Sequence, residues 1–258
     1  MDGAEVHIDV GAELWLFLAL RDRGRRLRAV HDGTSSLGHV IESLGVPLPE
    51  VGRLIVNGRV AVPAYRPRDG DMVQVQAIRR PQEVPDGPPS FVLDVHLGTL
   101  ARWLRLVGVD TAYRNDLDDD ALVAAANLEH RVLLTKDRGL LRRRRLWLGA
   151  YVRGALPDDQ FRDVLDRFAP PLAPWSRCTA CNGPLSPVGK DEAGPFLQPG
   201  TRRSYDTFAR CLTCGHLYWR GAHHRRLEAI VNTAMRTVSS GGRHAEGPTC
   251  QGGRAGGR

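Results

Sequence analysis

The sequence predicts an α/β protein in which a central parallel sheet lies between a small N-terminal domain and a C-terminal metal-binding module. Three observations lead to this fold class. Between Phe91 and Gly139, three short apolar runs are each followed closely by aspartate. The first 80 residues carry strand and turn patterns of their own, and two C-x-x-C pairs follow towards the C-terminus. We therefore expect three structural parts with different roles.

The composition favours a polyanionic partner and a reducing environment. The 258 residues are 42% hydrophobic and 25% charged, with a formal net charge of +7. This charge favours nucleic acid as a partner, although an arginine-rich composition accounts for it equally well. Four of the five cysteines occur in C-x-x-C pairs, which indicates a metal site in a cytoplasmic protein rather than disulfides. No apolar run approaches the ~18 residues of a membrane span. The run LWLFLAL follows acidic rather than basic residues, so we expect no signal peptide.

Residues 1–80 are predicted to form a separate domain with the order strand, strand, helix, strand, strand. An Asn57-Gly58 pair marks a hairpin, and Ser36 and its neighbours can cap the helix. This order is that of a β-grasp and resembles the ubiquitin-like sulfur carrier proteins. Those carriers need a free C-terminal Gly-Gly, whereas this chain continues into Pro81, so we expect an accessory domain that contacts RNA or protein. The predicted strands cover 5–10, 25–31, 53–62 and 72–78, and the helix covers 37–45.

Residues 91–170 are predicted to form a parallel-sheet α/β/α core after a proline-rich linker over 81–90. Apolar residues between the first two runs have helical spacing, from Leu97 to Val107. Strand, helix, strand, helix, strand at this spacing makes two βαβ units with parallel strands and right-handed crossovers. The expected strands cover 91–95, 109–114, 131–135 and 146–153, and the expected helices cover 97–107, 121–130 and 158–169.

Aspartates follow three of the predicted strands at the same edge of the sheet. The functional crevice of an open parallel sheet lies beyond the carboxyl ends of its strands, so Asp94, Asp137 and an acidic cluster over 116–120 should converge there. A carboxylate beside an apolar strand is costly without a cation, and oxygen ligands of this kind select Mg²⁺ or Mn²⁺. A phospho-aspartate hydrolase is disfavoured because it needs a second acid where His96 stands. A receiver domain is disfavoured because paired acids at its first strand are missing.

These acids receive predicted roles. The middle ligand is open among the four aspartates of the cluster, and Asp119 is preferred because Asp118 and Asp120 point away from it on a nascent helix. Thr135 is expected to orient a ligand or a bridging water beside Asp137. The predicted catalytic residues are Asp94, Asp116, Asp119 and Asp137, of which Asp94, Asp119 and Asp137 are predicted to bind Mg²⁺ or Mn²⁺.

The two C-x-x-C pairs predict a zinc ribbon over 171–235. Each pair is followed closely by glycine, and two such turns present four thiolates tetrahedrally to a structural Zn²⁺. A redox role is disfavoured because neither pair opens a helix of a thioredoxin-like unit. The residues between the pairs, 189–208, are expected to form an extended hairpin, and residues 236–258 a disordered glycine- and arginine-rich tail with Cys250 as a free thiol. The predicted zinc ligands are Cys178, Cys181, Cys211 and Cys214.

Basic and aromatic side chains supply candidate RNA contacts. Arg102 and Arg105 are expected to lie on the helix face away from Leu100 and Leu104, where they could steer a phosphodiester or simply be solvated. Interleaved aromatic and basic residues after the second cysteine pair are typical of base stacking, although they could equally pack the ribbon's core. The candidates for nucleic-acid binding are Arg102, Arg105, Arg142, Arg143, Tyr218, Trp219 and Arg220.

Taken together, these motifs resemble a known family. The stretches DVHLGTLARWLRLVGVDT, DLDDDALVAAA, RVLLTKDRGLL, RCTACNGPL and ARCLTCGHLYWRGAHHRRL, in this order, are similar to the "Mut-seven C" family of PIN-fold ribonucleases. Many bacterial members carry an N-terminal ubiquitin-like domain, which residues 5–77 resemble. The resemblance implies a PIN-type site with acids at Asp94, Asp119 and Asp137, and Asp116 as a neighbour. Ala121 stands where family members usually have another acid.

The sequence thus predicts a metal-dependent ribonuclease that hydrolyses RNA phosphodiester bonds, with transfer RNA or ribosomal RNA as candidate substrates. The alternative is a non-catalytic RNA- or ribosome-binding adaptor that uses the zinc ribbon. Sequence patterns leave the oligomeric state and the cleaved RNA open, because surface shape decides both.

Overall fold

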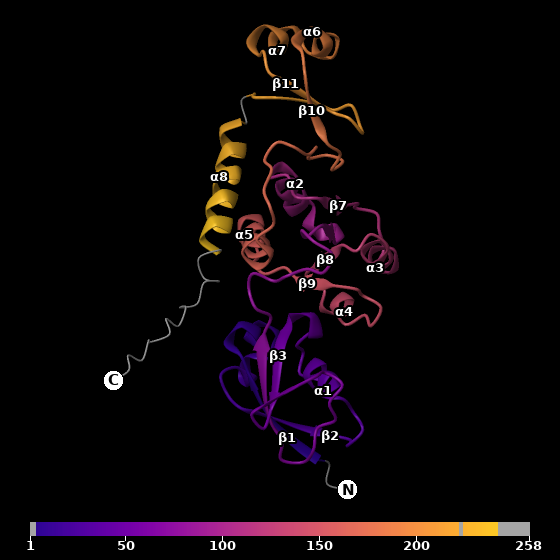
Figure 1. The fold of residues 1–258 in the computed structure, drawn as a ribbon, viewed down its shortest axis with the longest axis vertical. Coiled ribbons are helices and arrows are strands. Elements are labelled where there is room, and N and C mark those ends of the chain that lie inside the picture. The colour runs from indigo at the N-terminus through magenta and orange to yellow at the C-terminus, as the bar shows by residue number, and fades with distance from the viewer. Residues whose placement is uncertain (1–3, 222–223, 242–258) are drawn as a thin grey trace, which may run out of the picture. The chain divides into compact units, whose positions relative to one another are not determined.

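The computed structural model describes residues 4–221 and 224–241 (Figure 1). These residues form two compact units, and each unit consists of several segments that are separated in the sequence. The first unit contains the described residues up to Arg79, together with Pro89–Ala101 and Thr111–Arg153. The second contains Arg80–Pro88, Arg102–Asp110 and the described residues from Gly154 onward. The first unit contains a five-stranded and a four-stranded sheet, and the second contains a three-stranded sheet.

The N-terminal part of the first unit is the predicted β-grasp. Its five-stranded sheet has the order β2-β1-β5-β3-β4, in which β1 and β5 are parallel and the other pairs are antiparallel. Ser36 caps α1 by accepting a hydrogen bond from the His39 amide, as expected. The elements are β1 (Ala4–Val10), η1 (Ala12–Phe17), η2 (Leu20–Asp22), β2 (Leu27–His31), α1 (Leu37–Ser43), η3 (Leu48–Glu50), β3 (Val51–Val56), β4 (Arg59–Ala61) and β5 (Met72–Ala77).

The rest of the first unit is a four-stranded parallel sheet with the order β7-β6-β8-β9. Its strands are short and almost fully buried, and α3 and α4 pack side chains such as Leu122 and Leu140 against Val92 and Leu133. The predicted βαβ units are confirmed. The elements are β6 (Phe91–Leu93), η4 (Val95–Leu97), α2 (Gly98–Leu106), β7 (Thr111–Tyr113), α3 (Asp119–Leu128), β8 (Val132–Thr135), α4 (Arg138–Leu141) and β9 (Gly149–Tyr151). The residues of α2 from Arg102 onward belong to the second unit.

Within the first unit, the β-grasp and the parallel sheet share a polar junction. The Arg138 guanidinium donates to the carbonyl oxygens of Leu16 (2.9 Å) and Phe17 (3.0 Å) and lies over the Phe17 ring. Glu50 is completely buried and accepts a hydrogen bond of 2.8 Å from the Tyr151 amide. Since the charged guanidinium satisfies two carbonyls at the end of η1, this junction fixes α4 to the N-terminal domain.

The second unit contains α5 (Pro157–Phe168) and the segment 80–88, which includes most of the linker predicted for 81–90. Arg80 forms ion pairs with Asp163 (2.8 Å) and Asp166 (2.9 Å) of α5. Arg167, 1% exposed, donates to the Gln82 side chain at 2.8 Å. The start of the proline-rich segment is therefore held against α5 by its own side chains.

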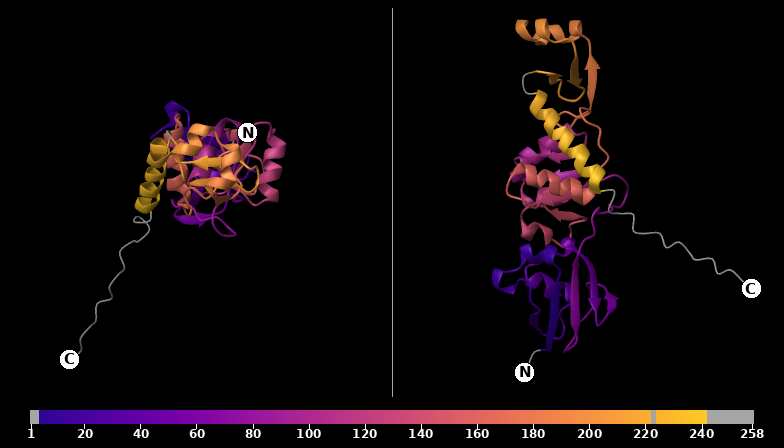
Figure 2. Two further views of the ribbon diagram at one scale, coloured as in Figure 1. Left: turned by 90° about the horizontal axis from the view of Figure 1, so that it is seen from above. Right: turned by 90° about the vertical axis from the view of Figure 1, so that its left-hand side faces the viewer.

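The cysteine-rich part of the second unit has a three-stranded sheet, β10-β11-β12, and a long final helix that packs against α5 (Figure 2). The hairpin predicted for 189–208 is wrong, because this stretch forms helical turns in which Pro195 and Pro199 occupy first-turn positions. The predicted tail from 236 begins inside a helix that continues to Gly241, while Cys250 and its neighbours lie outside the described residues. The elements are β10 (Leu185–Val188), α6 (Lys190–Ala193), η5 (Gly194–Phe196), α7 (Pro199–Ser204), β11 (Phe208–Cys211), β12 (Leu217–Trp219) and α8 (His224–Gly241).

The predicted fold class is confirmed: a parallel-sheet α/β core, an N-terminal β-grasp sheet and a C-terminal cluster of four cysteines. No helix in the described part of the chain has the length and hydropathy that a membrane crossing requires.

Candidate functional site

Two of the predicted catalytic aspartates meet at the carboxyl edge of the parallel sheet through Thr135. Asp94 follows β6, the strand between β7 and β8, and its Oδ2 accepts a hydrogen bond of 2.7 Å from the Thr135 hydroxyl. The same hydroxyl oxygen accepts a hydrogen bond of 2.9 Å from the Asp137 amide. Thr135 is completely buried, so its side chain has one fixed position. Thr135 therefore holds the Asp94 side chain and the Asp137 backbone, and its predicted role in orienting a metal ligand stays a prediction.

The turn after Asp94 is held from the neighbouring strand. The Tyr113 hydroxyl, at the end of β7, donates to the Val95 carbonyl at 2.8 Å. A Cβ at Gly98 would lie 2.7 Å from that hydroxyl oxygen, so only glycine leaves room for the tyrosine at this place. The chain leaving β6 is therefore fixed by both adjacent strands.

The acids also serve as helix caps. Asp137 is the N-cap of α4, and its Oδ1 accepts a hydrogen bond of 2.6 Å from the Gly139 amide. Asp118 is the N-cap of α3 and accepts one of 2.8 Å from the Ala121 amide. Each cap uses one carboxylate oxygen, so the other oxygen of Asp137 and of Asp118 is not engaged by the cap.

The remaining acids of the cluster are paired with arginines. Asp116 forms a bidentate pair with Arg114 (2.8 and 3.0 Å), and this hydrogen bonding lowers the pKa of Asp116. Arg143 lies 3.4 Å from Asp119 and also contacts Asp120. Arg143, predicted to contact nucleic acid, therefore neutralises the first turn of α3 in this structure.

The four cysteines form a complete metal-ligand set, and the aspartates do not. Among the described residues, Cys178, Cys181, Cys211 and Cys214 are the group of three or more candidate ligands whose donor atoms all lie within 4.8 Å of one another. The Sγ atoms are 3.7 Å apart between Cys178 and Cys214 and 3.4 Å apart between Cys181 and Cys211. A tetrahedral site with Zn–S bonds of ~2.3 Å has sulfur–sulfur distances of about 3.8 Å. The cluster could therefore hold a structural Zn²⁺.

Hydrogen bonds to Cys178 stabilise its thiolate form. Burial opposes ionisation of Cys178, but the Tyr218 hydroxyl, 3.0 Å from its sulfur, and backbone amides outweigh burial and lower its pKa to about 6. Burial, together with the hydrogen bond to Cys178, raises the pKa of Tyr218 to about 12. Tyr218 thus belongs to the cysteine site, where its hydroxyl contacts Cys178, and this contact supports a packing role rather than the predicted stacking on a base.

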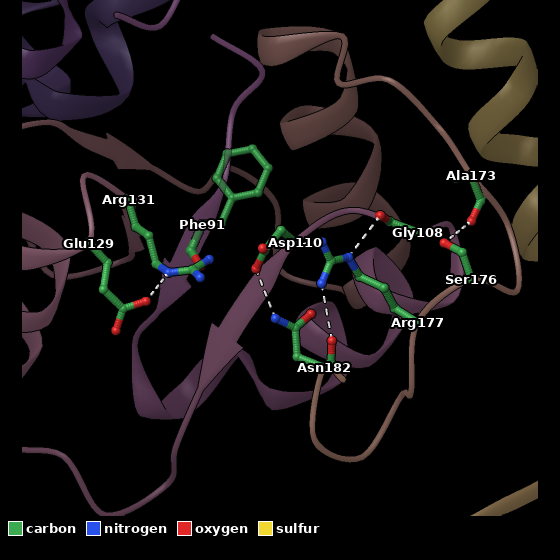
Figure 3. A network of polar contacts seen from close by, with 9 residues as sticks. All are labelled: Phe91, Gly108, Asp110, Glu129, Arg131, Ala173, Ser176, Arg177 and Asn182. Atoms are coloured by element: carbon green, nitrogen blue, oxygen red, sulfur yellow. Dashed lines mark hydrogen bonds and ion pairs between the residues drawn. The ribbon is translucent and has the colours of Figure 1, made fainter. Parts of the chain in front are cut away.

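A polar network ties the first cysteine pair to the loop after α2 (Figure 3). Arg177 donates to the carbonyls of Gly108 and Asn182 and pairs with Asp110, at 3.2 Å in each case. The Asn182 side chain donates to the other Asp110 oxygen at 2.8 Å. The same figure shows a second ion pair, between Arg131 and Glu129, that follows α3.

Arg105 is part of this support and not of an RNA surface. Its side chain is 3% exposed and donates to the carbonyls of Thr179 (3.2 Å) and Ala180 (2.7 Å), between the two cysteines of the first pair. The predicted solvent-facing position of Arg105 is therefore wrong. The two carbonyls lie more than 70 positions from Arg105 in the chain. Helical spacing within α2 gives no information about such distant residues, so it could not predict that Arg105 is buried against them.

Two protein-family models match this chain, one in the N-terminal domain and one in the remainder. The Mut7-C ubiquitin model matches residues 3–83 and the Mut7-C RNAse domain model matches residues 89–231. The second match covers more than half of the chain and includes both the aspartate edge and all four clustered cysteines. The chain belongs to the Mut7-C RNAse family. Comparisons with curated proteins and with solved structures gave no match.

The family description indicates a ribonuclease, with RNA as its substrate. Within this Mut7-C RNAse domain, the remaining predicted RNA contacts lie in different surroundings. Arg102 and Arg220 are exposed, and Trp219 is 42% exposed. Arg142 donates to the Glu42 carbonyl of the ubiquitin-like domain at 2.8 Å, so it stabilises the junction within the first unit. Sequence spacing grouped Tyr218 with Trp219, whereas strand alternation places them on opposite faces of β12.

Proposed function

We propose that this chain is a metal-dependent ribonuclease that hydrolyses RNA phosphodiester bonds at the carboxyl edge of a PIN-type sheet. Asp94, Asp119 and Asp137 would hold Mg²⁺ or Mn²⁺, with Asp116 as an acidic neighbour. The observation that carries the proposal is the Thr135 hydroxyl, which joins Asp94 and the Asp137 backbone at one edge. An all-oxygen donor set of this kind suits hard divalent cations.

The chain's own residues supply positioning and charge balance. When bound, the ion supplies a water of lowered pKa and stabilises charge on the phosphate oxygens, which leaves 5′-phosphate and 3′-hydroxyl ends. Thr135 restricts the Asp94 carboxylate to one orientation. Arg143 is the cation that a metal at Asp119 has to replace, and it would then be available to a phosphate.

The proposal is tested by cleavage assays on single-stranded and structured RNA with Mn²⁺ or Mg²⁺. Asp94→Asn and Asp137→Asn should each lose the metal-dependent cleavage. Asp206→Asn is the matched control, because Asp206 belongs to the second unit, its side chain is 85% exposed, and it pairs only with Lys190 among the contacts described. Equal cleavage by all three variants and the wild type would sink the proposal. Sequencing of RNA ends after expression of wild type or Asp94→Asn then identifies the cleaved RNA, with transfer RNA and ribosomal RNA as candidates.

A second candidate function is a non-catalytic RNA- or ribosome-binding adaptor. It is favoured by one observation: Asp94, Asp119 and Asp137 do not form a ligand group within 4.8 Å in the described part of the chain. Calorimetric titration of Mn²⁺ into zinc-loaded protein separates the two candidates. The ribonuclease predicts Mn²⁺ binding that Asp94→Asn abolishes, whereas the adaptor predicts RNA affinity with no such binding.

We further propose that the chain is organised as a ubiquitin-like domain over 1–80, a connecting segment over 81–90, a nuclease domain over 91–170 and a zinc ribbon over 171–235. Residues 236–241 belong to α8 and not to the predicted tail, and the residues after 241 lie outside the described part of the chain. Four zinc-binding thiols persist in a reducing compartment, so we place the activity in the cytoplasm.

A further inference from the structure

The ribbon contains a hollow that the aspartate site does not use. Its volume is about 510 Å³, and it is lined by Phe196, Arg210, Gly215, His216, Leu217 and Trp219. This volume lies in the range of small-ligand sites. All of these residues belong to the second unit and to the stretch that matches the Mut7-C RNAse domain.

The β11–β12 hairpin has two faces with different roles. Arg210 pairs with Leu217, and Phe208 pairs with Trp219, so these four side chains share one face. Tyr218 lies on the other face, where its hydroxyl reaches the Cys178 sulfur. Trp219 is therefore not needed to pack the cysteine site. Its ring borders the hollow and remains 42% exposed.

A second exposed aromatic ring and a cation complete the hollow. Phe196, at the end of η5, is 69% exposed, and the Arg210 guanidinium lies 4.7 Å from the centre of its ring. Arg210 also pairs with Glu192 at 3.3 Å, but the Glu192 side chain is 59% exposed. The Arg210 side chain is 26% exposed, and an incoming phosphate would compete with the more exposed Glu192 carboxylate for the guanidinium. The hollow thus combines two exposed aromatic side chains with a guanidinium that lies over the ring of one of them.

The second cysteine pair is followed directly by two residues that form one wall of this hollow, Gly215 and His216. Gly215 follows Cys214 with φ of +73°, a conformation that side chains rarely adopt, and the Cys211 amide donates to the His216 carbonyl. The ring of His216 lies 4.8 Å from that of Tyr218. Metal binding by the cysteines would therefore hold the wall formed by Gly215 and His216 in place.

We propose that this hollow binds one unpaired nucleotide of the RNA substrate, with its base stacked on Trp219 or Phe196 and its phosphate near Arg210. This inference rests on the proposed ribonuclease function and extends it to recognition of single-stranded RNA. Stacking on aromatic rings accepts any base, and it needs a base face that a duplex keeps covered. The hollow would therefore select strand state rather than sequence.

The test is fluorescence anisotropy with a short, unstructured, fluorescein-labelled RNA and the full chain loaded with zinc. Mg²⁺ and Mn²⁺ are left out so that the RNA is not cut. Trp219→Ala and Phe196→Ala should each weaken binding by about 5- to 100-fold, the range for loss of one base–aromatic stack. Trp219→Phe should retain most of the affinity. Trp175→Ala is the matched control, because Trp175 is 39% exposed and lies outside the hollow.

Two further measurements keep the outcome decisive. Zinc content equal to wild type shows that the ribbon has folded, and Phe196→Ala alters a side chain that packing barely restrains. The effect of Trp219→Ala should disappear on a duplex of the same sequence. Wild-type affinity in both alanine variants, or an equal loss in Trp175→Ala, overturns the proposal and leaves the hollow for a partner other than RNA. The catalytic proposal is tested separately by Mn²⁺-dependent cleavage, so its failure is distinguishable from failure of this binding proposal.

Discussion

Replacing Thr135 by valine should uncouple the Asp94 side chain from the Asp137 backbone while leaving the shape of the core intact. Valine keeps the volume of threonine but removes the hydroxyl that donates to Asp94 at 2.7 Å and accepts from the Asp137 amide at 2.9 Å. A hydrogen bond to a charged group is worth about 1.5–3 kcal/mol and a neutral one about 0.5–1.5 kcal/mol. Because Asp94 is partly exposed, water offsets part of this loss, and we expect about 2 kcal/mol of destabilisation.

The effect on metal dependence should exceed the effect on stability. Loss of a group that orients a metal ligand costs roughly 10- to 100-fold in metal affinity or activity. We therefore expect Thr135→Val to need about 10- to 100-fold more Mn²⁺ for half-maximal RNA cleavage. Thr135→Ser retains the hydroxyl and should stay close to wild type. The assay is a Mn²⁺ titration of initial cleavage rates, with urea unfolding of each variant alongside.

The reasoning about Thr135 is refuted by either of two results. Thr135→Val could show the wild-type Mn²⁺ dependence, which would mean that the hydroxyl does not position the ligands. Alternatively, Thr135→Ser could be as impaired as Thr135→Val, which would place the cause in packing rather than in hydrogen bonding.

Two other predictions concern the junction and the cysteine cluster. Arg138→Ala removes two charged hydrogen bonds to η1 and should lower the free energy of unfolding by about 2–3 kcal/mol in urea melts. The control is Arg144→Ala, at an exposed position, which should change the free energy of unfolding by less than about 0.5 kcal/mol. Equal values for the two variants would contradict a stabilising role of Arg138 at the junction. Cys211→Ser should lose bound zinc, measured by atomic absorption, and make the ribbon sensitive to protease while the parallel sheet stays resistant. Full zinc retention would disprove the proposed set of four ligands. Cys250→Ser, a change outside the described residues, serves as the control.

The elements of both sheets were predictable because each is encoded within a short window. The strand runs of the β-grasp, the Asn57-Gly58 turn and the aspartates after β6 and β8 follow from patterns a few residues long. The same holds for the cysteine pairs, whose two-residue spacing already places two thiolates on one turn. The stretch 189–208 was mispredicted because its glycines and prolines suit a hairpin turn and a helix start equally well.

The amino-acid sequence by itself determined the strands that place aspartates at one sheet edge and the two cysteine pairs that form one cluster. Only the tertiary structure decided which partners those residues meet. It buried Arg105 against the carbonyls of Thr179 and Ala180, and it placed Tyr218 and Trp219 in different sites. The physical reason is that desolvation and hydrogen bonding depend on atoms brought together by packing, and those atoms come from segments far apart in the chain.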